Sequence, residues 1–180
     1  MGQPAEHDPV LLIVGAFSRF PEALDWAKRE LERHFGPVAL ESPRFAFTET
    51  DYYAPTMGEG LEKQFYGFQR LIRPEEIVGI KLQTNALEEA YSRQGGHDVP
   101  RPLNLDPGYL SMAKWVLAST KDHAHRIYLG SGIYVELTLR YTAGEFAPWP
   151  WTYPDYRRDD YRAFLLHARR RYQGLLRGER

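Results

Sequence analysis

Cysteine is absent from the 180 residues, so the chain can form neither a disulfide framework nor a zinc site built on cysteine. Lysine is scarce as well, with 5 residues against 18 arginines. No apolar run is long enough to cross a bilayer, because the first one is broken by Gly15 and ended by Arg19. Glu6 and Asp8 stand where a secretory leader would carry basic residues. We therefore expect a cytoplasmic protein that makes no membrane contact.

Motifs with a fixed glycine spacing are missing too. The chain contains no G-x-x-x-x-G-K-[ST] phosphate loop, no G-x-G-x-x-G fingerprint and no G-x-S-x-G elbow. P-loop nucleotide hydrolysis is therefore poorly supported, and a site for a nucleotide would have to be built from other residues.

The charge is small overall but unevenly distributed. The net charge is −1, yet residues 1–156 carry 15 Lys and Arg against 21 Asp and Glu, whereas residues 157–180 carry 8 Arg against 3 acids. A basic tail of this kind can bind nucleic acid or an acidic partner. The solvated face of a helix is the commoner explanation of such a pattern.

Hydrophobic patterning predicts strands and helices in one domain spanning 1–180. In chain order we expect a central strand at 10–17, a helix at 21–35, an extended segment at 37–47 interrupted by Pro43, helices at 61–72 and 74–96, a turn at 106–108, a helix at 109–119 and an Arg-rich amphipathic helix within 157–180. Gly79 leaves a second reading of 77–83 open, as a strand ahead of a shorter helix. The fold class is α/β or α+β, with a mixed sheet, helices packed on its faces and residues 1–9 flexible.

A β-hairpin at about 126–141 is the clearest local signal. Apolar and polar residues alternate over nine positions from Ile133 to Tyr141, and a shorter alternation precedes the Gly130–Gly132 segment. Residues that face each other across a hairpin point to the same side of the sheet. A three-residue loop at 130–132 matches apolar with apolar, pairing Leu129 with Ile133, Ile127 with Val135, Tyr128 with Tyr134 and Arg126 with Glu136. We predict that loop.

The polar face of this hairpin predicts a ligand site. A solvated face is the ordinary explanation, but Lys121, Asp122 and His125 add further charge at the strand entrance. Arginine and lysine can clamp a phosphate, and imidazole titrates near neutrality. The candidate ligand-binding residues are Asn104, Lys114, Lys121, Arg126, Tyr128 and Tyr134. The candidate catalytic residues are His125 as the proton carrier, Glu136 as its orienting group and Asp106 as a second acid, placed at a strand end beside a helix N-terminus.

The H-x-H pair of His123 and His125 is a weak metal motif. On a strand both imidazoles would point the same way, and Asp106 or Glu136 could complete a ligand set. Continuing the alternation puts both histidines on the side of Ile127, where a packed structural histidine is the favoured reading. We expect no metal site, and the sequence names no cofactor.

Five ordered blocks resemble a known family. They are "FTETDYYAPTMG", "IKLQTNALE", "NLDPGYLSMAKWVLAS", "KDHAHRIYLGSGIYVELTLRY" and "PWTYPDYR", and together they are similar to the bacterial family called domain of unknown function 4416. The resemblance implies a single-domain bacterial protein and no established activity. It also implies recurrent polar residues at Asp51, Tyr52, Tyr53, Lys81, Asn85, Asn104, Asp106, Lys121, His125, Arg126, Glu136, Tyr153 and Asp155.

Two functional hypotheses follow. The first is a pocket for an anionic small molecule, phosphorylated or a nucleotide, together with acid–base catalysis. The alternative is a non-enzymatic module that binds RNA or protein through the C-terminal arginines and through a strap at 146–158, which is rich in Trp, Tyr and Pro. The sequence leaves open whether the protein is an enzyme.

Overall fold

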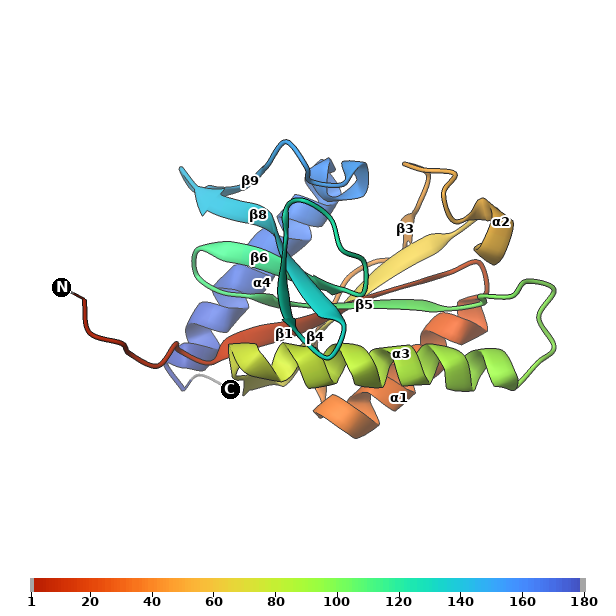
Figure 1. The fold of residues 1–180 in the computed structure, drawn as a ribbon, viewed down its shortest axis with the longest axis horizontal. Coiled ribbons are helices and arrows are strands. Elements are labelled where there is room, and N and C mark those ends of the chain that lie inside the picture. The colour runs from red at the N-terminus through yellow and green to blue at the C-terminus, as the bar shows by residue number, and fades with distance from the viewer. Residues whose placement is uncertain (1, 179–180) are drawn as a thin grey trace.

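The computed structural model describes residues 2–178, and its centre is one antiparallel sheet (Figure 1). The strands follow the order β2-β4-β1-β5-β6-β8-β7, with β3 added beside β4 and β9 beside β8. The elements are β1 (Val10–Ser18), α1 (Pro21–Phe35), β2 (Val38–Glu41), β3 (Phe45–Ala46), α2 (Ala54–Met57), β4 (Glu62–Ile72), η1 (Pro74–Glu76), α3 (Ile77–Arg93), β5 (Asn104–Leu110), β6 (Lys114–Ser119), β7 (Arg126–Gly130), β8 (Ile133–Thr142), β9 (Glu145–Pro148), η2 (Pro154–Arg157) and α4 (Asp159–Leu176).

Helices cover both faces of the sheet. Figure 1 shows α1 and α3 lying along one side, while α4 crosses the other. Because β1 is buried on both faces, alternate residues enter different cores: Leu12 and Val14 pack toward α1 and α3, whereas Leu11 and Ile13 pack toward α4. A third, small cluster contains Phe17, Phe47, Met57 and Leu61 under the segment that carries α2. The predicted single domain with helices on the sheet is therefore confirmed, and every described strand pair is antiparallel rather than mixed.

The predictions for 10–17, 21–35, 74–96 and the C-terminal helix are confirmed. Helix α3 continues through Gly79, so the strand reading of 77–83 is wrong. Helix α4 buries the predicted face, including Tyr161, Leu165 and Ala168, against the sheet. Residues 2–9 carry no helix or strand and are exposed, although the Pro9 carbonyl accepts a hydrogen bond from Tyr172 Oη at 2.8 Å.

Two predicted helices and one predicted turn are wrong. Residues 62–72 form β4, which is buried on both faces over most of its length and so lacks the alternation that marks a half-exposed strand. The Asp106-Pro107-Gly108 segment lies inside β5 instead of turning, and most of the predicted 109–119 helix is strand β6. Asp106 is consequently on a strand and not beside a helix N-terminus.

The hairpin register is confirmed except at its tip. Arg126 pairs with Glu136 and Tyr128 with Tyr134, but a bulge at Leu129 lets Gly130 pair with Ile133. The turn is therefore two residues long, Ser131 (φ 53°) and Gly132 (φ 75°), and both have the positive φ of the tight hairpin turns that match strand twist. The bulge absorbs the odd residue that the predicted three-residue loop had placed in the turn.

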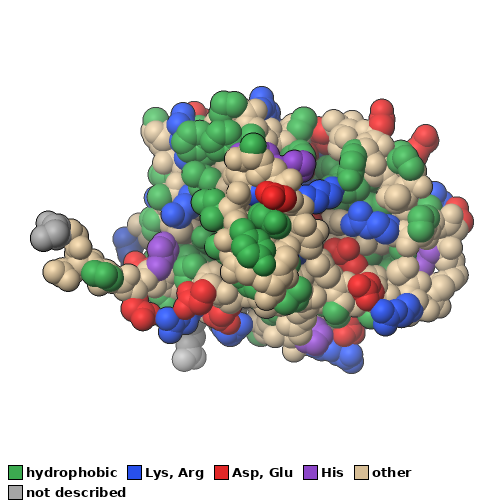
Figure 2. All heavy atoms as spheres, in the orientation of Figure 1, with side chains coloured by type: hydrophobic (Ala, Val, Ile, Leu, Met, Phe, Trp, Pro, Cys, Tyr) green, Lys and Arg blue, Asp and Glu red, His purple; other side chains and the backbone are tan. Residues whose placement is uncertain are grey.

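The apolar side of β7 is exposed, contrary to the prediction. Ile127 is 68% exposed and Leu129 is 45% exposed, because β7 is the last strand of the sheet. Figure 2 shows hydrophobic side chains gathered on this face of the molecule, and basic and acidic side chains interspersed around them. Burial in the hairpin is divided between its two faces: Glu136 and Thr138 of the polar face are almost inaccessible, and so are Ile133 and Leu139 of the apolar face, whereas Tyr128 of the polar face is 58% exposed.

Candidate functional site

The sheet is open between β5 and β6. Their pairing covers only Gly108 to Leu110 opposite Trp115 to Leu117, so the first half of β5 has no strand on that side. Side chains of α3 take the place of the missing ladder: Leu105 N donates to Glu88 Oε1 at 2.7 Å, and Leu105 O accepts from Lys81 Nζ at 2.9 Å. In an antiparallel strand every second residue directs its backbone N–H and C=O to the same side. Pro107, two residues after Leu105, therefore also faces this unpaired side, where its lack of an N–H loses no ladder bond.

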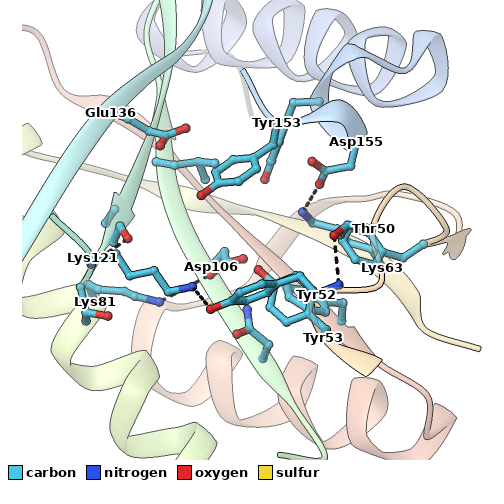
Figure 3. Close-up of a pocket in the computed structure, with 18 of the residues that line it drawn as sticks. Thr50, Tyr52, Tyr53, Lys63, Lys81, Asp106, Lys121, Glu136, Tyr153 and Asp155 are labelled. Atoms are coloured by element: carbon cyan, nitrogen blue, oxygen red, sulfur yellow. Dashed lines mark hydrogen bonds and ion pairs between the residues drawn. The ribbon is translucent and has the colours of Figure 1, made fainter. Parts of the chain in front are cut away.

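A cavity of about 740 Å³ occupies this opening. Its wall is assembled from the ends of several strands, from α3, from η2 and from the loops at 47–53 and 119–123 (Figure 3). The ionisable side chains on the wall are Glu49, Tyr52, Tyr53, Lys63, Lys81, Glu88, Glu89, Arg101, Asp106, Lys121, His123, Arg126, Glu136, Tyr153, Asp155 and Tyr156. The size lies within the range of small-molecule sites, and acids and bases are both abundant.

Lys121 and Tyr52 meet at the rim of the cavity. Lys121 Nζ donates to Tyr52 Oη at 2.8 Å and lies 4.4 Å from the centre of the Tyr52 ring. This hydrogen bond lowers the pKa of the Tyr52 phenol. Within residues 2–178 no carboxylate lies within 4 Å of Lys121 Nζ. The ammonium is thus held only by a neutral acceptor.

Arg126 and Glu136 form a buried ion pair behind the rim. Glu136 Oε2 accepts from Arg126 Nε at 2.9 Å and lies 3.2 Å from His125 Nε2, while Glu136 Oε1 accepts from Thr138 Oγ1 at 3.1 Å. Arg126 also donates to Ser119 Oγ at 2.7 Å. Glu136 therefore contacts both Arg126 and His125, and each of its two oxygens accepts a hydrogen bond.

The rest of the Arg126 guanidinium is also occupied. It donates to the Lys121 carbonyl at 3.0 Å and to Tyr153 Oη at 3.0 Å. The side chain is only 4% exposed. Arg126 thus fixes the backbone of Lys121 and the ring of Tyr153, and it is better placed to position the wall than to clamp an incoming anion.

Lys63 lies at the base of the cavity within a ring of aromatic side chains. It is 2% exposed, and its Nζ donates to Asp155 Oδ2 at 2.8 Å. Five rings surround the ammonium at 4.4–5.6 Å: Phe17, Phe47, Phe65, Tyr156 and Tyr161. Burial is the largest single effect and lowers the pKa of Lys63, but the charge and hydrogen bond of Asp155, together with Tyr161 and Asp106, outweigh it, so the net pKa is raised. Lys63 is therefore charged at neutral pH.

A second polar group lies beside the open part of β5. Asp106 Oδ1 is 3.6 Å from Lys81 Nζ, and Arg101 Nη2 is 3.5 Å from Glu88 Oε2 and donates to Asn104 Oδ1. Burial raises the pKa of Glu88, and the positive charge of Lys81 opposes that rise. These five residues come from α3, from β5 and from the loop before β5.

Most, but not all, of the predicted site residues meet at this cavity. The cavity is lined by Asn104, Asp106, Lys121, Arg126 and Glu136. His125 is not on the wall but contacts Glu136. His125 is thus directed at Glu136 and not packed on the side of Ile127, and its ring stacks between Trp151 and His123.

Three predicted residues lie elsewhere. Lys114 pairs with Arg140 at the far end of β6, while Tyr128 and Tyr134 contact each other near the hairpin tip, with their rings tilted at 53° and ring centres 5.1 Å apart. None of the three is on the cavity wall.

Sequence reasoning missed Lys63, Glu88 and Arg101. The partner of Lys63 is 92 residues away and the Leu105 N–H bound by Glu88 is 17 residues away, so local patterns could not join them. The one available signal was a lysine within the apolar stretch of β4 in a chain with few lysines. Of the thirteen polar positions implied by the family resemblance, eleven line the cavity, and only Asp51 and His125 do not.

The C-terminal arginines lie apart from the cavity and are largely tied to the body. Arg157, Arg158, Arg162 and Arg169 each donate to a backbone carbonyl of another segment. In the strap, Trp149 stacks on Trp151 at 5.2 Å and β9 pairs with β8. Binding of RNA or protein by these elements stays a prediction.

Comparison with family models decides where the chain belongs. The model of the family described as Domain of unknown function (DUF4416) matches residues 8–172. The chain is a member of the DUF4416 family. The part matched by the DUF4416 model includes every residue of the cavity wall. Comparison with curated proteins and with solved structures gave no match.

The described residues show neither a metal-binding cluster nor a membrane-spanning helix. Among residues 2–178 no group of three or more His, Asp or Glu side chains is arranged so that it could hold a metal ion. No helix in the same range has the length and apolar character needed to cross a bilayer.

Proposed function

We propose that the cavity binds an anionic small molecule, namely a phosphorylated compound or a nucleotide, and that Lys121 is its anion ligand. One observation carries the proposal: Lys121 is a cavity cation without a carboxylate partner in the described chain. The other four Lys and Arg side chains on the cavity wall each have a carboxylate partner. The pairs are Lys63–Asp155 (2.8 Å), Lys81–Asp106 (3.6 Å), Arg101–Glu88 (3.5 Å) and Arg126–Glu136 (2.9 Å).

The exchange of partners at Lys121 favours an anion. A phosphate oxygen would replace the neutral Tyr52 hydroxyl as acceptor, and a hydrogen bond between two charged groups is stronger than one to a neutral oxygen. Tyr153 Oη, fixed by Arg126, adds a further polar group on the wall. Because Lys121 is exposed, salt should weaken this contact.

The apolar part of the wall supports a ligand that also has a flat, uncharged portion. Phe17, Phe47 and Tyr53 pack together with ring centres 4.9–5.8 Å apart, and all three line the cavity. Aromatic rings commonly contact planar ligands in pockets of this size.

An acid–base step in this cavity would rest on two groups. His125 is held by Glu136 in a fixed orientation, as a proton carrier needs, but it contacts the cavity through Glu136 and not directly. Asp106 faces the cavity, and no described side chain donates a hydrogen bond to it, so its carboxylate is the better candidate base.

The test compares phosphorylated compounds with their dephosphorylated counterparts at low salt. Inorganic phosphate, sugar phosphates and nucleotides are screened by thermal shift, and hits are measured by titration calorimetry. Ligand binding to the folded state raises the unfolding temperature by mass action. We expect Lys121→Gln to weaken binding about tenfold, which corresponds to about 1.4 kcal/mol.

Lys114→Gln is the matched control, because it removes a lysine that lies outside the cavity. Binding to this variant should equal binding to the unaltered chain. Equal affinity for phosphorylated and dephosphorylated compounds, or equal losses in the two lysine variants, would refute the proposal.

A further inference from the structure

The side-chain nitrogen of Asn104 is a buried donor without a partner. Asn104 is 5% exposed and lines the cavity. Its Oδ1 accepts a hydrogen bond from Arg101, which assigns Nδ2 to the other end of the amide, and Nδ2 makes no hydrogen bond. Buried polar groups are nearly always paired in folded proteins, so an unpaired one on a cavity wall points to a missing acceptor.

Asp106 is the complementary group. It lies two residues after Asn104 on β5, and side chains two apart on a strand point to the same face. Its Oδ1 is 3.6 Å from Lys81 Nζ, too far for a hydrogen bond, and no other side chain of residues 2–178 donates to it. Both carboxylate oxygens can therefore accept from a ligand.

Lys81 supplies a second donor. It is buried, and its Nζ gives one hydrogen bond to the Leu105 carbonyl at 2.9 Å. An ammonium group has three donors, so two are left. Figure 3 shows Lys81, Asp106 and Lys121 directed toward the same part of the cavity, with Lys121 at the Tyr52 rim.

A phosphate does not suit the Asp106 end. The carboxylate of Asp106 would repel it, and Glu88 lies close by, paired with Arg101. The groups on offer are the two acceptor oxygens of one carboxylate and the free N–H donors of two nitrogens, Asn104 Nδ2 and Lys81 Nζ. Two adjacent hydroxyls match this set, because each can donate to one oxygen of Asp106 and accept from one nitrogen.

We infer that Asn104, Lys81 and Asp106 recognise the vicinal hydroxyls of a ribose, so that the ligand is a ribonucleotide or ribose phosphate. This inference rests on the proposed function, which assigns the phosphate to Lys121, and adds the sugar. It predicts that a ligand without the 2′-hydroxyl leaves one oxygen of Asp106 and one donor without the partner that this hydroxyl would supply. Sites built to bond a hydroxyl reject analogues that lack it.

The experiment measures affinities of the full chain by titration calorimetry for the four ribonucleoside 5′-monophosphates, their 2′-deoxy forms and the four ribonucleosides. With the unaltered chain we expect at least one ribonucleotide to bind about tenfold or more tightly than its 2′-deoxy form. Asp106→Asn should remove most of this preference, while Lys121→Gln should weaken both forms equally. Asp25→Asn, an acid of α1 outside the cavity, is the matched control and should preserve the preference.

The outcomes separate the two proposals. Equal binding of the ribo and 2′-deoxy forms, with both dependent on Lys121, overturns the ribose inference and leaves the anion site standing. No binding by any of the twelve compounds overturns the ribose inference, and the anion site then depends on the phosphate screen. Because the ribo and deoxy forms are compared on the unaltered chain, the test stays decisive even if Asp106→Asn fails to fold.

Discussion

Removing one partner of the Lys63–Asp155 pair should destabilise the fold strongly. Both side chains are at least nine-tenths buried, and the ammonium has aromatic rings around it instead of water. At an effective dielectric constant of about 20, two unit charges 2.8 Å apart attract by about 6 kcal/mol, which offsets the cost of burying them. Lys63→Met leaves the Asp155 carboxylate buried and unpaired, and Asp155→Asn leaves the ammonium without an anion.

The expected loss is about 3–5 kcal/mol for either single variant, the usual cost of breaking a buried pair. At about 2–4 °C per kcal/mol for a chain of this size, the unfolding temperature falls by roughly 10 °C. The raised pKa of Lys63 fixes the pH dependence. Its contribution is fully present below the unfolded value of 10.5 and is lost only above its folded pKa, so the effect of Lys63→Met should be constant between pH 6 and 9.

Urea unfolding of both single variants and of the double variant measures the coupling. Because the double variant contains neither charge, it should lose at least 2 kcal/mol less than the two single losses added together. Lys28→Met is the control, since it breaks a solvent-accessible pair with Glu41 and should cost less than about 1 kcal/mol. Additive losses, or single losses no larger than that of the control, would show that the pair does not stabilise the fold as argued.

Three further predictions concern other features. Gly108→Ala should destabilise by about 3 kcal/mol or more in urea unfolding, because a Cβ there would lie 2.3 Å from Val116 O and 2.7 Å from the Trp115 ring; a loss under 1 kcal/mol would contradict this. Ser131→Asn should raise stability by about 0.5 kcal/mol in a thermal melt, since asparagine tolerates the positive φ of this turn; a lower melting temperature would count against the turn assignment. Burial raises the pKa of Glu88 above 4.5, so the folded state loses stability as the pH rises above 4.5 and this carboxyl ionises. Between pH 4.5 and 8 the melting temperature of Glu88→Gln should therefore fall less with pH than that of the unaltered chain. Parallel curves of melting temperature against pH would contradict this.

The helices that were predicted well from the sequence have one buried face and clear ends. Helix α1 begins at Pro21 and ends before Gly36, with a single apolar stripe between them. The segment 61–72, which contains strand β4, fails this test. Leu61, Phe65, Phe68 and Ile72 follow helical spacing, but the strand is covered on both faces, so the alternation of a half-exposed strand is hidden. Burial by the rest of the fold, and not local preference, decides such segments.

The site was predictable only where its residues share a strand pair. Arg126 and Glu136 are opposite each other in the hairpin, so alternation alone placed them together. Asp106 was placed at the site on a wrong premise. The Asp-Pro-Gly sequence, which usually marks a turn, was interpreted as a turn between a strand and a helix. Here Pro107 sits where the β6 ladder is absent, so its missing N–H costs no hydrogen bond, and only the three-dimensional pairing reveals this.

At one end of the sheet, the cavity lies between the layers that cover its two faces. Its wall includes Lys81, Asn85 and Glu88 of α3 on one side and Asp155 and Tyr156 of η2 on the other. A molecule bound there would contact both layers at once. Occupancy should therefore slow amide hydrogen exchange in α3 and around η2 together, because the two regions would open as one cooperative unit instead of separately.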